Sequence, residues 1–315
     1  MTVIECDGQT KLAIQEHAPP TASFGEAIVA VKAISLNSGD VRGAFAAPPG
    51  HRPGWDFAGV VEAAPDGSRF LPGDRVVGLK FEGAWAELVS VSTTYLAPIP
   101  DHIPFEVAAV LPVAGLTAAI ALTKKRLASG DKVLVTAATG GVGLLAVQLA
   151  AAKGADVTAY AREERDVPLL RRLGAKTVVS NPETAARTGP YDLILEGVGG
   201  RLLGNALTWL APRGVCVQFG DAGGDELTTF DAKAFRLGGG GAFGGTSLYG
   251  FFLIEELTRP QATQAAPLLE SLAARLGAGT LDPVIGRLGT WDEIDDVARA
   301  LLTRGFKGKA VLRVG

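Results

Sequence analysis

Apolar residues in the first 115 positions occur in short runs that Gly and Pro interrupt. Such runs are EAIVAVKAIS from Glu26, AGVVEAA from Ala58, DRVVGL from Asp74 and AELVSVS from Ala86. β-Branched residues in short runs between turn residues are typical of strands. The regular spacing of these runs predicts a compact β-rich unit.

The pattern changes from about Leu116 to strand-like runs that alternate with helical segments. This alternation favours a doubly wound parallel sheet, which binds ligands at the carboxyl ends of its strands. The chain has 315 residues, enough for about two domains. The expected parallel strands are 133–136, 157–161, 177–179, 193–195 and 215–219.

The segment VLVTAATGGVG from Val133 places a glycine-rich turn after an apolar strand and before the helical segment that begins at Leu144. Ala138, Gly140 and Gly143 match a G-x-G-x-x-G pattern, with alanine in its first position. Glycines there let the backbone approach a phosphate and aim the free N–H groups of the helix at it. A second strand follows about 20 residues later, as in dinucleotide-binding units. We therefore expect a dinucleotide pyrophosphate at this turn.

The second strand, DVTAYA, ends on Arg162, with Arg165 close by. An acidic residue usually binds the ribose 2′-OH of NAD at this place, whereas an arginine suits the 2′-phosphate of NADP. These residues predict NADPH as the cofactor. The alternative is a solvated charged helix start, because Glu163, Glu164 and Asp166 lie among the arginines.

Bulk composition limits the partner classes. The formal net charge is −3 and Lys and Arg are scattered, so nucleic acid is not an expected partner. The two cysteines, Cys6 and Cys216, have neither CxxC nor zinc-finger spacing, which fits a reducing compartment. The first residues lack the basic and apolar regions of a signal peptide. We expect a cytoplasmic protein.

Two uncharged stretches, 107–123 and 133–152, have the composition of membrane spans. The first contains Pro112 and Gly115 and reaches only about 25 Å as a helix, against roughly 30 Å for a bilayer core. The second contains the glycine turn. We expect both to be buried between protein layers, and we expect no membrane partner.

Motifs spread over nearly the whole chain carry a resemblance. They are LNSGD (36–40), GWDFAGVV (54–61), PGDRV (72–76), GAWAE (83–87), AGLTA (114–118), AATGGVG (137–143) with AVQLA (146–150), and GKAVL (308–312). Through these segments the chain resembles the medium-chain dehydrogenase/reductase superfamily, specifically its zinc-independent quinone oxidoreductase-like branch.

The resemblance implies an α/β fold, with a Rossmann doubly wound parallel sheet and a β-rich GroES-like catalytic domain. The catalytic domain would be discontinuous, comprising residues 1–115 and 260–315, and the Rossmann dinucleotide-binding domain would comprise residues 116–259. Cofactor and substrate would lie in the cleft between them. Relatives are often homodimers, so we expect a homodimer that acts on a small-molecule substrate.

Catalytic zinc needs three converging protein ligands from Cys, His and carboxylates. Zinc-dependent relatives have a cysteine near the N-x-x-D segment and a His-Glu pair where this chain has Trp55-Asp56. No cysteine lies between Cys6 and Cys216, and the histidines lack ligand spacing (His17, His51 and His102). We expect no metal.

By resemblance, Asn37 and Thr117 border the nicotinamide and the substrate. The Asn37 amide would donate to a carbonyl oxygen as negative charge develops, or it would cap local backbone before Asp40. Asp40 completes the predicted catalytic group, and we expect it to hydrogen-bond backbone or Arg42 rather than transfer protons. The stretch VRGAF (41–45) lacks the tyrosine that several quinone and polyketide enoyl reductases carry there. No proton donor stands out, and solvent would serve.

The NADPH site is expected to combine the glycine turn with loops that follow later strands and with the closing strand. The glycine-dense segment 237–245 would be either a loop near the ligand or a solvent-exposed turn. The predicted cofactor contacts are Ala138, Thr139, Gly140, Gly141, Val142, Gly143, Arg162, Val198, Gly220, Asp221, Phe243, Gly244 and Lys309.

NADPH would then deliver a hydride to a quinone or an α,β-unsaturated carbonyl, with the protein orienting the nicotinamide against the substrate. An enoyl-thioester reductase in a biosynthetic pathway is the alternative enzyme, for which Arg42, His51 and Arg52 would form a basic entrance. A non-catalytic NADPH-binding regulatory module is the alternative outside enzymes. An S-adenosylmethionine methyltransferase fits less well, because Arg162 stands where such enzymes usually carry an acidic residue.

Overall fold

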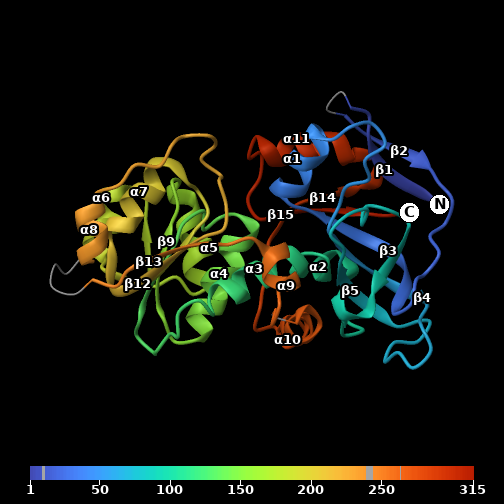
Figure 1. Ribbon diagram of the computed structural model, residues 1–315, viewed down its shortest axis with the longest axis horizontal. Coiled ribbons are helices and arrows are strands. Elements are labelled where there is room, and N and C mark those ends of the chain that lie inside the picture. Colours follow the sequence, from blue (N-terminus) through green and yellow to red (C-terminus); the bar gives the residue numbers. More distant parts are fainter. Residues whose placement is uncertain (9–10, 239–243, 263) are drawn as a thin grey trace. The chain divides into compact units, whose positions relative to one another are not determined.

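The computed structural model describes residues 1–8, 11–238, 244–262 and 264–315. The chain divides into two compact units (Figure 1). Unit 1 consists of Met1–Leu116 and Gln261–Gly315, and unit 2 of Thr117–Pro260. Unit 1 is therefore discontinuous, because unit 2 lies within it in sequence.

Unit 2 is built on a parallel sheet with the strand order β10-β9-β8-β11-β12-β13. Numbered along the chain, this order is 3-2-1-4-5-6, the order of a doubly wound dinucleotide-binding sheet. It reverses between β8 and β11, where such sheets bind their ligands. The strands are β8 (Lys132–Val135), β9 (Asp156–Tyr160), β10 (Thr177–Val179), β11 (Tyr191–Glu196), β12 (Leu210–Gln218) and β13 (Ser247–Gly250).

Helices cross over between these strands and cover the sheet (Figure 1). On one face, Leu134, Ile194 and Cys216 from three neighbouring strands pack with Ala185 of α6 and Leu207 of α7. Side chains alternate between faces along a strand, so the residues between them point to the other face. The helices are α3 (Leu111–Ala121), which spans the boundary between the units, α4 (Gly141–Ala152), α5 (Val167–Arg172), α6 (Pro182–Thr188), α7 (Gly200–Thr208), α8 (Ala232–Leu237) and α9 (Leu253–Thr258).

Unit 1 is β-rich, as the short apolar runs predict. Its main sheet follows the order β14-β15-β3-β4-β5-β7, with β6 also paired to β3, and β1 and β2 form a separate antiparallel pair. Strand β15 runs antiparallel to β3, so the last residues of the chain complete a sheet made by the first. The strands are β1 (Thr2–Cys6), β2 (Leu12–Glu16), β3 (Glu26–Leu36), β4 (Asp56–Ala63), β5 (Arg75–Leu79), β6 (Leu88–Ser92), β7 (Leu96–Pro98), β14 (Ile285–Thr290) and β15 (Lys309–Arg313).

The core of unit 1 lies between this sheet and the elements around it. Phe57, Trp85 and Leu36 are among its fully buried side chains. Its helices are α1 (Ser38–Ala46), α2 (Phe105–Ala108), α10 (Ala265–Gly277) and α11 (Ile294–Leu302), and short 3-10 turns occupy Thr93–Tyr95 and Trp291–Glu293. A further 3-10 turn, Glu164–Asp166, belongs to unit 2.

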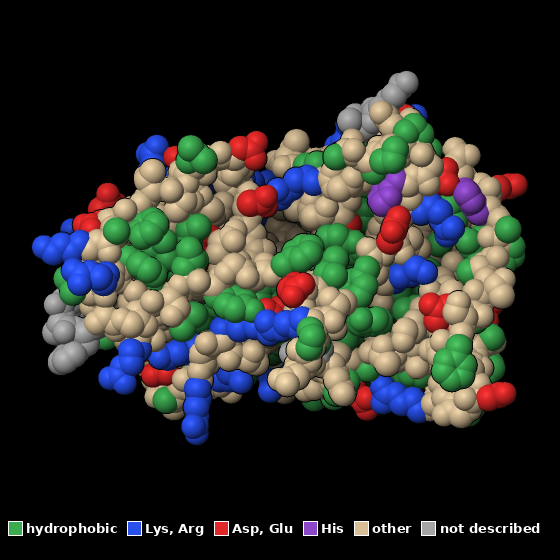
Figure 2. Space-filling view, in the orientation of Figure 1, with side chains coloured by type: hydrophobic (Ala, Val, Ile, Leu, Met, Phe, Trp, Pro, Cys, Tyr) green, Lys and Arg blue, Asp and Glu red, His purple; other side chains and the backbone are tan. Residues whose placement is uncertain are grey.

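The two uncharged stretches behave as expected from their sequence. Residues 107–123 contain α3, and residues 133–152 contain a strand, the glycine turn and α4. Across the described part of the chain, no helix combines the length and apolarity that a membrane crossing needs. On the face shown in Figure 2, acidic and basic side chains are interspersed with hydrophobic ones.

Candidate functional site

The glycine turn joins the carboxyl end of β8 to the amino end of α4. Its two glycines Gly140 and Gly143 have different surroundings. A Cβ at Gly143 would lie 2.3 Å from the carbonyl oxygen of Ala137 and 2.8 Å from Cα of Ala138, so only glycine fits. A Cβ at Gly140 would meet only the Ala137 oxygen, at 3.3 Å, because the remaining space beside it is open. Gly143 therefore serves the close approach of helix and turn, and Gly140 leaves room for a ligand.

The first turn of α4 is suited to an anion. Gly140 is its N-cap residue, and no side chain of the described residues caps the helix. The first N–H groups of a helix lack partners within the helix, and the helix dipole favours negative charge there. Thr139, Gly141 and Val142 are only half-buried at this end. These residues fit the pyrophosphate of a dinucleotide.

Arg162 is exposed just beyond the carboxyl end of β9. Its neighbour Arg165 is ion-paired with Glu163, whereas Arg162 forms no ion pair with any residue that the structure describes. Burial raises the pKa of Tyr160, and the positive charge of Arg162 opposes this rise. Arg162 therefore has a free guanidinium at the edge of the sheet where the glycine turn lies.

The loops after β11 and β12 lie against each other at the same edge. The backbone N–H of Ala222 donates to the carbonyl of Gly197 at 3.0 Å, and that of Gly223 donates to Val198 at 2.6 Å. The predicted contacts Val198, Gly220 and Asp221 thus share one loop cluster. Gly220 is held close, because a Cβ there would lie 3.0 Å from the Gly197 oxygen.

One predicted cofactor contact, Gly244, falls elsewhere. The carbonyl of Gly244 accepts from the backbone N–H of Arg213 at 3.1 Å, and Gly244 precedes the amino end of β13. In a parallel sheet the amino ends lie at the edge opposite the carboxyl ends, so Gly244 lies away from the glycine turn. Phe243 lies outside the described residues, and its contact stays a prediction.

Glu196 is a residue that the sequence reasoning did not assign. It is the last residue of β11 and is completely buried. Its carboxylate accepts hydrogen bonds from the Thr136 hydroxyl at 3.0 Å and from the backbone N–H groups of Val198 at 2.8 Å and Gly199 at 3.0 Å. A carboxylate that ends an apolar strand and precedes glycines (LILEGVGG) was the available signal.

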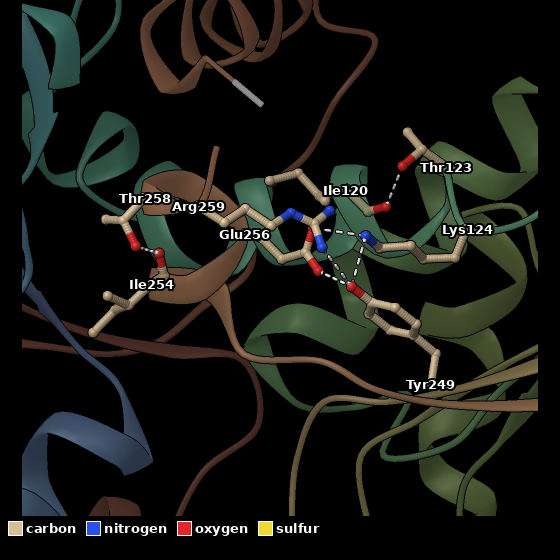
Figure 3. A network of polar contacts seen from close by, with 8 residues as sticks. All are labelled: Ile120, Thr123, Lys124, Tyr249, Ile254, Glu256, Thr258 and Arg259. Atoms are coloured by element: carbon tan, nitrogen blue, oxygen red, sulfur yellow. Dashed lines mark hydrogen bonds and ion pairs between the residues drawn. The ribbon is translucent and has the colours of Figure 1, made fainter. Parts of the chain in front are cut away.

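A second polar cluster of unit 2 centres on the buried Glu256 of α9 (Figure 3). Lys124 Nζ donates to Glu256 Oε2 at 2.6 Å, and Arg259 Nη2 donates to the same oxygen at 2.8 Å. Tyr249 of β13 donates to the other carboxylate oxygen, and its hydroxyl accepts from Lys124 at 3.2 Å and Arg259 at 3.1 Å. The cluster ties the segment after α3 to β13 and α9.

In unit 1, three strand ends and the first turn of α1 bring together the half-buried Asn37 and the buried Asp40, Asp56 and Lys309. Asn37 follows β3, Asp56 begins β4 and Lys309 begins β15, and both of these strands pair with β3. The Asn37 amide donates to Asp56 Oδ2 at 2.9 Å and to Asp40 Oδ2 at 3.2 Å, and its oxygen accepts from Lys309 Nζ. Lys309 Nζ also lies 3.2 Å from Asp56 Oδ2. The hydrogen-bonding groups of the Asn37 side chain are therefore used within the cluster.

The charges of this cluster are unequal, because two carboxylates face one ammonium group. Burial raises the pKa of Asp40 to about 8, and the negative charge of Asp56 adds to this rise. Burial also raises the pKa of Asp56, which the Lys309 ammonium and hydrogen bonds from Asn37 and the Val113 backbone oppose. At neutral pH Asp40 therefore holds a proton.

Asp40 also hydrogen-bonds backbone, as expected, because its Oδ1 accepts the backbone N–H of Asn37 at 2.7 Å. This contact caps the start of α1. Thr117 is buried in α3 and is the first residue of unit 2. The structure thus gathers Asn37, Asp40 and Lys309 in unit 1, while Thr117 belongs to unit 2.

The residues present do not fit a catalytic zinc. Asp56 and the Asn37 oxygen are already occupied by the Lys309 ammonium, and Asp40 is the only other carboxylate of this cluster. Within residues 1–8, 11–238, 244–262 and 264–315, no group of three or more His, Cys, Asp or Glu side chains could hold a metal ion. Zinc needs at least three such ligands.

Comparisons with known proteins agree with this architecture. The model of the zinc-binding dehydrogenase family matches residues 141–271, and that of the alcohol dehydrogenase GroES-like domain matches residues 23–101. Rat (Rattus norvegicus) quinone oxidoreductase is 31% identical over 303 residues, which are 90% of this chain and 88% of that protein. The solved quinone oxidoreductase of Coxiella burnetii is 25% identical, with a TM-score of 0.84 over 100% of this chain and 99% of that one.

A longer protein is also similar. Erythronolide synthase EryA2 of Saccharopolyspora erythraea is 35% identical over 304 residues, which cover 91% of this chain but only 8% of the synthase. The chain therefore corresponds to a small part of that protein. From its motifs, its fold and its similarity to relatives over nearly their whole length, the chain belongs to the medium-chain dehydrogenase/reductase superfamily, in its quinone oxidoreductase-like branch.

Proposed function

We propose that the protein is an NADPH-dependent, zinc-independent reductase that transfers a hydride to a quinone or an α,β-unsaturated carbonyl. The observation that carries this proposal is the glycine turn at the switch point of the parallel sheet, with an unpaired arginine at the end of the next strand. Membership of an oxidoreductase family supports hydride transfer. One family model is named for zinc, but the cluster around Lys309 argues against a metal in this chain.

The cofactor would be held by residues of unit 2. The turn Ala138–Gly143 would bind the pyrophosphate through backbone N–H groups, and the Arg162 guanidinium would bind the 2′-phosphate. Val198 and the Gly220–Asp221 pair would border the other half of the dinucleotide. When bound, the nicotinamide supplies the hydride, and the protein supplies orientation and electrostatics.

In unit 1 the buried cluster would support the substrate side. The hydrogen bonds of Asn37 argue against a role as oxyanion donor, because both amide hydrogens are already donated to carboxylates. The proton that completes reduction would come from solvent. We also propose that Thr117 contacts the nicotinamide and that Lys309 contacts the cofactor.

An enoyl thioester is the second candidate substrate. It is supported by the 35% identity to a segment of a polyketide synthase. In the proposed basic entrance, the Nε of Arg52 is buried and has no hydrogen-bond partner among the described residues. His51 lies 3.3 Å from Glu82, which reduces its value as an anion contact. Enones and enoyl thioesters share hydride transfer to a conjugated C=C bond, whereas a quinone is reduced at its conjugated carbonyl groups.

A homodimer in the cytoplasm is proposed as the assembly and compartment. Among the described residues, strand β13 pairs with β12 alone, and Leu248 on it is 46% exposed. An open sheet edge with an exposed apolar side chain is a surface on which a second strand can pair. The two cysteines are buried free thiols, which suits a reducing compartment.

The test combines binding and turnover. Arg162→Ala is expected to weaken NADPH binding about tenfold while leaving NADH binding unchanged, because a charge-assisted hydrogen bond to the 2′-phosphate is lost. Arg171→Ala, an exposed arginine of α5, is the matched control. Equal losses for both cofactors would overturn the NADPH assignment. NADPH oxidation with quinones, enones and enoyl-CoA esters then identifies the substrate class, and NADPH binding without turnover on any panel would favour the regulatory module.

A further inference from the structure

Glu196 connects two loops that lie at the switch point of the sheet. Its Oε1 accepts from the Thr136 hydroxyl on the β8 side and from the Val198 N–H on the β11 side, while Oε2 accepts from the Gly199 N–H. The Thr136 hydroxyl oxygen in turn accepts the backbone N–H of Gly197 at 2.9 Å. One buried carboxylate therefore fixes both the start of the glycine turn and the loop of residues 197–199.

The chemistry of this position demands a carboxylate. Both oxygens act as acceptors for N–H or O–H donors, so an amide in the same place would turn its NH₂ group toward another donor. Burial raises the pKa of Glu196, and the hydrogen bonds from Val198, Gly199 and Thr136 oppose this rise. Burying a carboxylate is costly unless it is hydrogen-bonded. Apolar packing alone would not select glutamate at the end of an otherwise apolar strand.

The position of Glu196 relates it to one half of a dinucleotide. A doubly wound sheet consists of two mononucleotide-binding halves that meet where the strand order reverses. The half made by β8, β9 and β10 carries the glycine turn and Arg162, which suit the adenosine 2′-phosphate. The half made by β11, β12 and β13 carries the loop of residues 197–199 and would receive the nicotinamide mononucleotide.

We propose that Glu196 is a positioning residue for the nicotinamide half of the cofactor, acting through the 197–199 loop and Thr136 without contacting the cofactor itself. This inference rests on the proposed NADPH function. Loop 197–199 is further held by the loop after β12, through the bonds of Ala222 and Gly223. Loss of the carboxylate would therefore misplace backbone at the nicotinamide half and leave the adenosine half in position.

The variant Glu196→Gln tests this inference through binding rather than turnover. Dissociation constants are measured by titration calorimetry for NADPH and for 2′,5′-ADP, a probe that contains only the adenosine half. We expect NADPH affinity to fall about tenfold or more, because hydrogen bonds to a charged group are replaced by a donor conflict. We expect 2′,5′-ADP affinity to stay within about twofold of the parent protein.

Asp192→Asn provides the matched control. Asp192 lies near the other end of β11, and its carboxylate likewise accepts a backbone N–H, that of Lys132 at 2.9 Å. It should leave the affinity for both ligands unchanged. Hydrogen exchange adds a second readout, since Glu196→Gln should speed exchange at Val198 and Gly199 and leave Leu134 protected.

The outcomes separate this inference from the proposed function. Unchanged NADPH affinity in Glu196→Gln would overturn the positioning role, and so would an equal loss for NADPH and 2′,5′-ADP, which would indicate general damage to the site. If the parent protein bound neither ligand, the NADPH assignment itself would fail. Retained 2′,5′-ADP binding together with weakened NADPH binding supports both.

Discussion

The buried cluster of unit 1 makes stability depend on pH in a way that one substitution isolates. Asp40 is only 3% exposed, and its pKa is raised to about 8 from the ordinary 3.8 by burial and by the charge of Asp56. Asp40→Asn keeps the size of the side chain and cannot ionise. The amide oxygen can still accept the backbone N–H of Asn37, so the cap of α1 is retained.

The size of the effect follows from the shift. Between pH 4 and pH 8 the folded protein keeps a proton on Asp40 that the unfolded chain releases, so the free energy of unfolding falls as pH rises. The slope approaches 1.36 kcal/mol per pH unit. From pH 5 to pH 7 the parent protein should therefore lose about 3 kcal/mol more than Asp40→Asn, and above about pH 8 the two curves should become parallel.

Urea unfolding followed by tryptophan fluorescence, at half-unit steps from pH 5 to pH 9, measures this difference. Asp66→Asn, which removes an exposed carboxylate from a turn, controls for the general loss of one acidic group. It should leave the pH dependence of the parent protein unchanged. If Asp40→Asn and the parent lost stability in parallel over pH 5 to 7, Asp40 would be ionised in the folded protein and the reasoning would be refuted.

Two further substitutions test the geometry of unit 2. Gly143→Ala should destabilise the protein by about 1–3 kcal/mol and reduce NADPH affinity, because its Cβ would overlap the Ala137 carbonyl. Gly140→Ala should leave the thermal midpoint nearly unchanged. Equal thermal midpoints for the two variants would contradict this account of the turn. Glu256→Gln should lower unfolding free energy by about 2 kcal/mol, because Lys124 and Arg259 lose their carboxylate, while Glu255→Gln should cost little. Urea unfolding of Glu256→Gln and Glu255→Gln measures this difference. An unchanged free energy of unfolding in Glu256→Gln would show that solvent replaces the carboxylate.

The sequence predicts those elements of this chain whose structure depends on interactions within one segment. Strand-like runs and glycines around Gly140 and Gly143 predict a strand, a turn and a helix, because their packing is local. Strand β13 was not predicted, since SLYG is short and half polar and becomes a strand only by pairing with β12. Its assignment depends on residues distant in sequence.

The candidate site shows the same limit. Arg162 could be found because its place after β9 follows from strand spacing. The position of Glu196 after an apolar strand could be found in the same way, but its role could not, because its hydrogen-bond donor Thr136 follows another strand, 60 residues away in sequence. The cluster of Asp40, Asp56 and Lys309 likewise depends on β15 joining β3. Sequence motifs locate these residues, but they do not show which side chains form hydrogen bonds or ion pairs with one another.

The cluster around Glu256 has a consequence for how the two units fold. Unit 2 is an insertion in unit 1, so unit 1 can assemble its sheet only if the chain leaves after residue 116 and returns at residue 261. Lys124 and Glu256, close to these two points in sequence, are joined at 2.6 Å. A folded unit 2 thus replaces a long flexible loop by a short bridge, which lowers the entropic cost of closing unit 1 by on the order of 2 kcal/mol. Folding of unit 2 thereby stabilises unit 1, whose two segments it separates in sequence.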